Sequence, residues 1–169
     1  EGMGEEARRL EPRAVVETVA RTLQLELDLR MEAAGASELA EVAAIDGHVR
    51  IPKVIWDGVG KRVLTLEWAE GMALSDPKAL AQEGLDRPAL ADNVIRGFLS
   101  QALDHGVFHA DLHEGNLFAA PPDLLTAVDF GIIGRIGPNE RRYLAEILYG
   151  FLERDYRHVA QVHFDAGYV

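Results

Sequence analysis

Two stretches in the second half of the chain carry oxygen ligands at a spacing suited to phosphoryl transfer. The first, residues 109–116, contains Asp111 and, five positions later, Asn116; the second, residues 127–131, contains Asp129 followed by Phe and Gly. In a magnesium-nucleotide site, one carboxylate faces the attacking hydroxyl or water, while an amide and a second carboxylate hold the metal ions that bridge the phosphates. The spacing predicts Asp111 as catalytic base or orienting group, and Asn116 and Asp129 as ligands of Mg²⁺ or Mn²⁺.

The histidines that flank Asp111 allow a second interpretation. His109, Asp111 and His113 alternate along the chain, and His-x-Asp-x-His resembles the ligand cluster of a metal-dependent hydrolase. That interpretation gives the Asp-Phe-Gly triplet no role. We therefore favour a loop in which His109 forms bracing backbone hydrogen bonds and His113 does the same or helps to hold phosphate.

Composition limits the classes of function. The 169 residues are 48% hydrophobic and 27% charged, which predicts one domain, or a large part of one, with a real core. The net charge of −11 argues against nucleic acid as a partner and against simple attraction to an anionic membrane. Without cysteine, a disulfide scaffold and a thiolate metal site are excluded. No signal peptide is visible and no apolar run reaches the roughly 18–20 residues that span a bilayer, so we expect a soluble piece whose membrane contacts lie in other segments.

The elements that must position these loops follow an α+β order. Apolar residues at helical spacing predict one long helix over residues 13–42, with Gly35 as a weak point. Two β-rich runs, 53–56 and 62–68, predict a hairpin with a longer loop, followed by a hinge at 69–71. Further helices are predicted at 77–83, 89–104, 138–153 and 155–163, with short strands at 117–118 and 125–128. This order predicts a ligand cleft at the hinge.

The first predicted helix carries a second acidic cluster. Asp28 and Glu32 are four positions apart and share a helical face, whereas Glu26 lies about 200° from Asp28 at 3.6 residues per turn. A regular helix cannot point all three at one ligand. Chemistry alone therefore favours a solvated charged face, with Arg30 as a local partner.

Three blocks of sequence resemble the UbiB-like atypical kinases, members of the protein-kinase-like superfamily tied to ubiquinone biosynthesis. The blocks are residues 26–34, residues 108–118 together with 129–134, and residues 142–157. They span nearly the whole chain in the family's order. The resemblance implies a protein-kinase-like fold, with a partial N-terminal lobe (αC-like helix and final hairpin) at 1–68 and the helical C-terminal lobe with the catalytic and metal-binding loops at 69–169.

The resemblance also implies roles for the first helix and the hinge. Glu26 and Asp28 match an ExD motif that reaches across the nucleotide site and restrains ordinary kinase activity. Glu32 matches the αC glutamate that pairs with an ATP-holding lysine. The implied adenine-facing hinge is Glu67, Trp68 and Ala69.

The activity that the resemblance implies is Mg-nucleotide binding with phosphoryl transfer or ATP hydrolysis, supporting ubiquinone biosynthesis at the cytoplasmic face of the bacterial inner membrane. Its implied cofactors are ATP and Mg²⁺ or Mn²⁺. Its implied partners are the nucleotide, a lipid or quinone precursor and ubiquinone-biosynthesis proteins.

The chain departs from the family pattern at its front. Its lysines, Lys53, Lys61 and Lys78, all follow Glu32, whereas a kinase-type ATP lysine precedes that glutamate. The family's KxGQ helix and alanine-rich phosphate loop are not in this sequence, and Glu114 stands where the family usually has proline. We therefore expect a fragment with weak or no turnover on its own.

Two other function classes stay open at this point. A small-molecule kinase of the aminoglycoside or choline type also uses Asp-x4-Asn followed by Asp, although it has no need of Glu26 and Asp28. A non-catalytic, pseudokinase-like module would sense a lipid or a partner protein. The intact Asp111, Asn116 and Asp129 argue against complete loss of metal binding in such a module.

Overall fold

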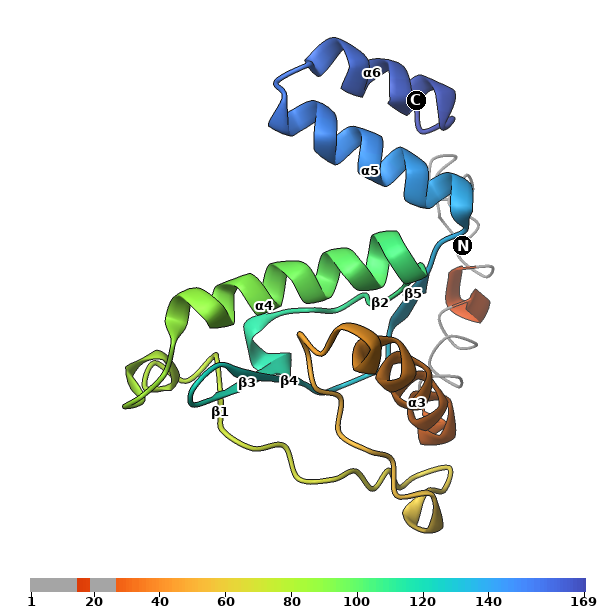
Figure 1. The fold of residues 1–169 in the computed structure, drawn as a ribbon. Helices are drawn as coiled ribbons and strands as arrows, with labels where there is room; N and C mark the ends of the chain where they lie inside the picture. Colours follow the sequence, from red (N-terminus) through yellow and green to blue (C-terminus); the bar gives the residue numbers. More distant parts are fainter. Residues whose placement is uncertain (1–14, 19–26) are drawn as a thin grey trace, which may run out of the picture.

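The structure is a computed structural model that describes residues 15–18 and 27–169. Figure 1 shows α4 lying along the small strands, α3 at one end of them, and α5 and α6 as an adjacent pair. The α-helices are α3 (Leu29–Asp46), α4 (Arg87–Leu99), α5 (Pro138–Leu152) and α6 (Tyr156–Asp165). The strands are β1 (Met72–Ala73), β2 (Val107–His109), β3 (Leu117–Ala120), β4 (Leu124–Ala127) and β5 (Ile133–Arg135). The expected α+β class is confirmed.

Two antiparallel sheets carry the loops of interest. One has the order β1-β3-β4, and the other pairs β2 with β5. Arg50 adds a parallel bridge beside β4, because its N–H donates to the Leu125 carbonyl at 2.8 Å and its carbonyl accepts from the Ala127 N–H at 3.0 Å. The strands predicted at 117–118 and 125–128 correspond to β3 and β4. The others were not predicted because two or three residues carry too little periodic signal.

The single long helix predicted over residues 13–42 is wrong. Residues 15–18 are helical, but Asp28 has φ −104° and ψ 89°, and its carboxylate accepts the Arg30 N–H as the N-cap of α3. An aspartate that bonds a nearby backbone N–H favours a helix start over continuation of a helix. Asp28 is thus the N-cap of α3, and Glu32 lies in its first turn.

Glycines decide where two of the helices end. α3 continues beyond the predicted end at residue 42, to Asp46, and stops at Gly47, whose φ is 71°. The predicted helix at 89–104 is α4 followed by a π-helix, Ser100–His105, which stops at Gly106 with φ 74°. Glycine accepts this left-handed conformation without a Cβ penalty.

The hairpin and the small helix are less regular than predicted. Continuous strands at 53–56 and 62–68 are wrong, since only Val54–Leu66 and Gly60–Val63 bridge, around a 3₁₀ turn at Trp56–Gly58. An isolated two-stranded ribbon is marginally stable, which accounts for the sparse pairing. The helix predicted at 77–83 is reduced to a 3₁₀ turn, Ala79–Ala81, whereas α5 and α6 match their predictions closely.

The core lies between α3, α4 and the strands. Its largest fully buried apolar side chains are Phe130, Leu39 and Leu125. The core therefore sits directly beneath the loop that carries Asp129. In the described part of the chain, no helix is both long and apolar enough to cross a membrane.

Candidate functional site

An acidic pocket of about 280 Å³ opens where the start of α3 meets the loops after β2 and β4. Four carboxylates contribute to its lining, which consists of Asp28, Met31, Glu32, Asp111, Asp129, Gly131 and Ile132. The first three of these residues come from the start of α3. The others come from the loop after β2, which carries Asp111, and the loop after β4, which carries Asp129; we call these the catalytic loop and the metal loop after the roles predicted for them. Tertiary folding thus joins both acidic clusters that the sequence contains.

His109 bridges the two loops that carry Asp111 and Asp129. The side chain is buried, and its Nδ1 accepts the Asp111 N–H at 3.2 Å while its Nε2 lies 3.0 Å from the Val128 carbonyl. A carbonyl can only accept, so Nε2 carries the proton and the ring is a neutral tautomer with both nitrogens engaged. His109 is therefore unavailable as a metal ligand.

The hydrolase interpretation of His109, Asp111 and His113 finds no geometric support. Within residues 15–18 and 27–169, no group of three His, Asp or Glu side chains is arranged to hold a metal by itself. His113 is half-exposed, its Nδ1 accepts the Gly115 N–H at 3.0 Å, and its Nε2 lies 3.8 Å from Asp111 Oδ2. His113 thus braces its own turn and stands beside the Asp111 carboxylate.

Asn116 lies beneath the catalytic loop, outside the lining of the acidic pocket. Asn116 is 7% exposed. Its side-chain Nδ2 donates to the Asp111 carbonyl at 3.1 Å, and its backbone carbonyl accepts from the Val128 N–H at 2.9 Å. The amide nitrogen is therefore committed to the loop, so Oδ1 is the Asn116 atom suited to a cation.

Asp129 holds an unusual backbone conformation. Its φ is 63°, a left-handed value that costs free energy for a residue with a Cβ and that occurs often at functional sites. The following Phe130 is buried and packs against His109 with ring centroids 5.6 Å apart. Because Phe130 is anchored in the core, the preceding carboxylate is left at the pocket.

α3 docks on the segment after Asp129 through one face. Glu32 Oε1 accepts the Phe130 N–H at 3.2 Å, across 98 positions of sequence. One turn later, a Cβ on Gly35 would lie 2.9 Å from Ile133 Cγ1 and 3.4 Å from the Phe130 carbonyl. Gly35 is therefore a contact point that requires the absence of a side chain. Glu32, matched by resemblance to a lysine partner, here binds the backbone beside Asp129.

Asp28 differs from the other pocket carboxylates because it forms an ion pair with an arginine. Arg30 donates from Nε to Oδ1 at 2.8 Å and from Nη2 to Oδ2 at 2.6 Å. This bidentate contact lowers the pKa of Asp28 to about 2. The local partner expected from the sequence is thus present, while Glu26, the other ExD residue, lies outside the described residues.

The predicted hinge lies away from the acidic pocket. Glu67 accepts the Lys53 N–H at 3.2 Å and lies 3.5 Å from the Arg50 guanidinium, while the Trp68 side chain is 85% exposed. None of Glu67, Trp68 and Ala69 lines the pocket. The structure therefore brings together four of the predicted acidic residues, Asp28, Glu32, Asp111 and Asp129, but not the hinge.

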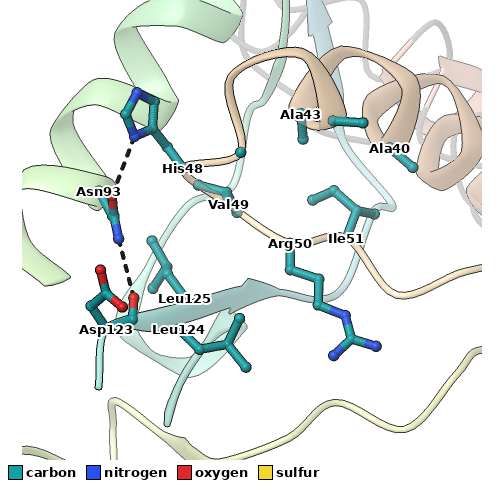
Figure 2. A pocket seen from close by; sticks show the side chains of 12 residues that line it. Ala40, Ala43, His48, Val49, Arg50, Ile51, Asn93, Asp123, Leu124 and Leu125 are labelled. Atoms are coloured by element: carbon teal, nitrogen blue, oxygen red, sulfur yellow. Dashed lines mark hydrogen bonds between the residues drawn. The ribbon is translucent and has the colours of Figure 1, made fainter. Parts of the chain in front are cut away.

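A larger cavity of about 380 Å³ lies behind α3. Figure 2 shows it between alanines of α3, residues 47–51 and the start of β4, with a polar edge where Asn93 joins His48 and the Asp123 carbonyl at 3.2 and 3.1 Å. None of the predicted site residues lines it. The predicted residues Asp28, Glu32, Asp111 and Asp129 line the smaller, acidic pocket instead.

Gln101, a buried residue that contacts the catalytic loop, was not predicted from the sequence. Its Oε1 accepts the His109 N–H at 3.3 Å. A glutamine within a helical run gives no local signal of such a role.

Comparison with known proteins places this arrangement in a family. The profile of the ABC1 atypical kinase-like domain matches residues 3–163. The chain belongs to this family. Curated relatives include the "Probable protein kinase UbiB" of Marinobacter nauticus, 39% identical over 169 residues, and that of Pseudomonas paraeruginosa, 40% identical over 174. These alignments cover 97% and 100% of this chain but 31% and 32% of the relatives, so the chain spans about a third of their length.

A solved structure supports the same architecture. The complex of Rv3197 with erythromycin from Mycobacterium tuberculosis aligns with a TM-score of 0.69 and 22% identity, over 90% of this chain and 38% of that one. At this identity the likeness concerns the fold. The resemblance to the UbiB-like kinases and the kinase-like α+β fold predicted from the sequence are both confirmed.

Proposed function

We propose that this ABC1-family chain forms the metal- and phosphate-facing side of a magnesium-nucleotide site in an atypical kinase or ATPase of the UbiB type. The observation that carries the proposal is the convergence of Asp111 and Asp129 on one pocket with Glu32. Asp28 and Glu32 already have partners in Arg30 and the Phe130 N–H. A backbone N–H carries no net charge, so the unbalanced negative charge of the pocket lies on Glu32, Asp111 and Asp129.

The donor set fits a magnesium or manganese ion. Asp129 and the Oδ1 of Asn116 would hold it, since both are hard oxygen ligands. Mg²⁺ commonly takes only one or two protein carboxylates and completes its shell with water and substrate phosphates. The described residues place no three His, Asp or Glu side chains around one point, and a Mg²⁺ ion does not require such a group. When bound, the ion would neutralise charge on the transferred phosphoryl group.

Asp111 is the candidate catalytic residue. Its side chain is 52% exposed at the pocket, so an acceptor hydroxyl or a water can reach it. There the carboxylate would orient that group and accept its proton. Its backbone is held by His109 and Asn116, which fixes the loop without consuming the carboxylate.

The wider role is proposed for the full-length protein. The UbiB name of the relatives and the resemblance support a function in ubiquinone biosynthesis, with ATP as nucleotide, a lipid or quinone precursor and ubiquinone-biosynthesis proteins as partners, and a position at the cytoplasmic face of the bacterial inner membrane. Glu67, Trp68 and Ala69 are proposed to face the adenine, and Glu26 with Asp28 to restrain kinase activity. Because no lysine precedes Glu32, we propose that this chain alone turns over weakly or not at all.

Calorimetric titration of the full-length protein with ATP, with and without Mg²⁺, tests the proposal. We expect metal-dependent binding, and a loss of turnover of about a hundredfold or more in Asp129→Asn because the main ligand charge is removed. Asp92→Asn is the matched control, since Asp92 is an exposed α4 residue that pairs with Arg96. Equal nucleotide binding with and without metal would contradict the site. Robust hydrolysis by the isolated chain would contradict its proposed incompleteness.

A further inference from the structure

One edge of β2 has no strand beside it in the described part of the chain. On the side of β5, the Ala110 N–H donates to the Ile132 carbonyl at 3.0 Å and the Ile136 N–H donates to the Gly106 carbonyl at 2.9 Å. Because N–H groups alternate between the two edges of a strand, the His109 N–H points to the opposite edge. That N–H belongs to a buried residue and needs a partner. The Oε1 of Gln101 supplies it at 3.3 Å.

The π-helix that carries Gln101 is fixed by contacts with other elements. Its Ser100 Oγ donates to the Asp46 carboxylate at the end of α3, and Arg141 Nη1 donates to the Asp104 carbonyl at 2.6 Å. Gln101 is only 6% exposed. The wider turn of a π-helix changes which residues face inward compared with a continuing α-helix, and such turns recur at functional sites.

We propose that Gln101 is a positioning residue for phosphoryl transfer at the acidic pocket, an inference that rests on the proposed function. Gln101 holds the His109 backbone. The His109 ring in turn holds the Asp111 N–H and the Val128 carbonyl, directly before Asp129. Gln101 therefore fixes the separation of the two carboxylates without touching nucleotide or metal. Small displacements of reacting groups lower the reaction rate more than they weaken substrate binding.

Two substitutions in the full-length protein separate positioning from packing. Gln101→Met keeps the length of the side chain but removes the acceptor, and Gln101→Glu keeps an acceptor oxygen. Gln82→Met is the matched control, because Gln82 also braces backbone, donating to the Ala79 and Ala119 carbonyls at 2.8 and 3.0 Å. The readouts are kcat and KM for Mg-ATP, and hydrogen exchange by mass spectrometry in peptides covering 107–113 and 126–131.

For Gln101→Met we expect faster exchange in both peptides and a kcat lowered by about tenfold or more, with KM for Mg-ATP changed by less than about twofold. Gln101→Glu should recover most of the lost kcat. Gln82→Met should leave kcat and both peptides unchanged.

Three results would overturn the proposal. The first is unchanged exchange in Gln101→Met, which would show that the contact holds neither loop. The second is a kcat loss matched by Gln82→Met, or not recovered by Gln101→Glu, which would indicate a general packing effect. The third is a wild-type protein without Mg-dependent turnover, which would overturn both the proposed function and the role of Gln101 in it. Hydrogen exchange in the two peptides would still show separately whether Gln101 holds His109.

Discussion

The catalytic and metal loops, residues 107–135, and the hairpin with the hinge, residues 50–71, are held in different ways. A buried hydrogen bond from Gln101 of the π-helix and a partly buried one from Glu32 of α3 reach the loops. The hairpin has isolated bridges, and Arg50 reaches Glu67 and Glu70 at 3.5 Å with all three side chains partly exposed.

This difference has consequences for free energy. An exposed ion pair contributes about 0–1 kcal/mol, whereas a buried polar group that loses its partner costs about 1–3 kcal/mol. The metal-facing side of the proposed site is thus pre-organised by contacts within this chain. The hinge side carries few contacts of that kind among the described residues.

The largest expected effect is that of His109→Leu on the free energy of unfolding. The substitution leaves the Asp111 N–H and the Val128 carbonyl without their ring partner; the His109 side chain is buried and both hydrogen bonds are partly buried. We expect a loss of about 2–5 kcal/mol, measured by urea denaturation. His113→Leu, at a half-exposed position in the same loop, should change stability by less than about 1 kcal/mol. Similar losses for the two variants would show that the contacts of the buried His109 contribute no more to stability than those of the half-exposed His113.

A smaller effect on the free energy of unfolding is expected where α3 approaches the metal loop. Gly35→Ala places a methyl group 2.9 Å from Ile133 Cγ1 and 3.4 Å from the Phe130 carbonyl, and overpacking of this kind costs about 1–3 kcal/mol. The control is Gly60→Ala in the hairpin, where no heavy atom lies within 4 Å of the new methyl group. There we expect no loss, or a gain of up to about 1 kcal/mol. Thermal unfolding of both variants checks the prediction, and a neutral Gly35→Ala would contradict it.

The smallest effect should appear only through its pH dependence. The α3 start joins the two regions, because the Leu29 N–H donates to the Lys61 carbonyl at 3.1 Å. The pKa of Asp28 falls from 3.8 to about 2 on pairing with Arg30. The contribution of the Asp28–Arg30 pair to the free energy of unfolding is therefore complete above pH 3.8 and is lost as the pH falls towards 2.

Unfolding free energies of wild type and Asp28→Asn between pH 6 and 2 measure this effect. Asparagine keeps the helix cap and loses the charge, so the difference between the two proteins should shrink as the pH falls. Arg30→Gln should abolish the same pH-dependent part. A difference that stays constant with pH would show that the ion pair contributes nothing to stability.

Much of the fold could be predicted locally. α5 begins at the predicted Pro138 and α6 is capped by Asp155, because capping and proline preferences depend on near neighbours. The break before α3 could not be read from apolar periodicity, which continues through Leu27. The helix α3 begins there because the Asp28 side chain accepts the Arg30 N–H as its N-cap. The short strands β2 and β5 depend on each other across the chain, so neither carries its own signal.

The sequence by itself determined the order of Asp111, Asn116 and Asp129, the type of ligand they present and the family they indicate, because residue type and spacing are local properties. Only the tertiary structure decided that Asp28 and Glu32 share a pocket with Asp111 and Asp129. It also decided that Glu32 binds the Phe130 N–H and that Gln101 supports His109. These contacts arise because buried N–H groups take whichever acceptor the packed core brings within reach.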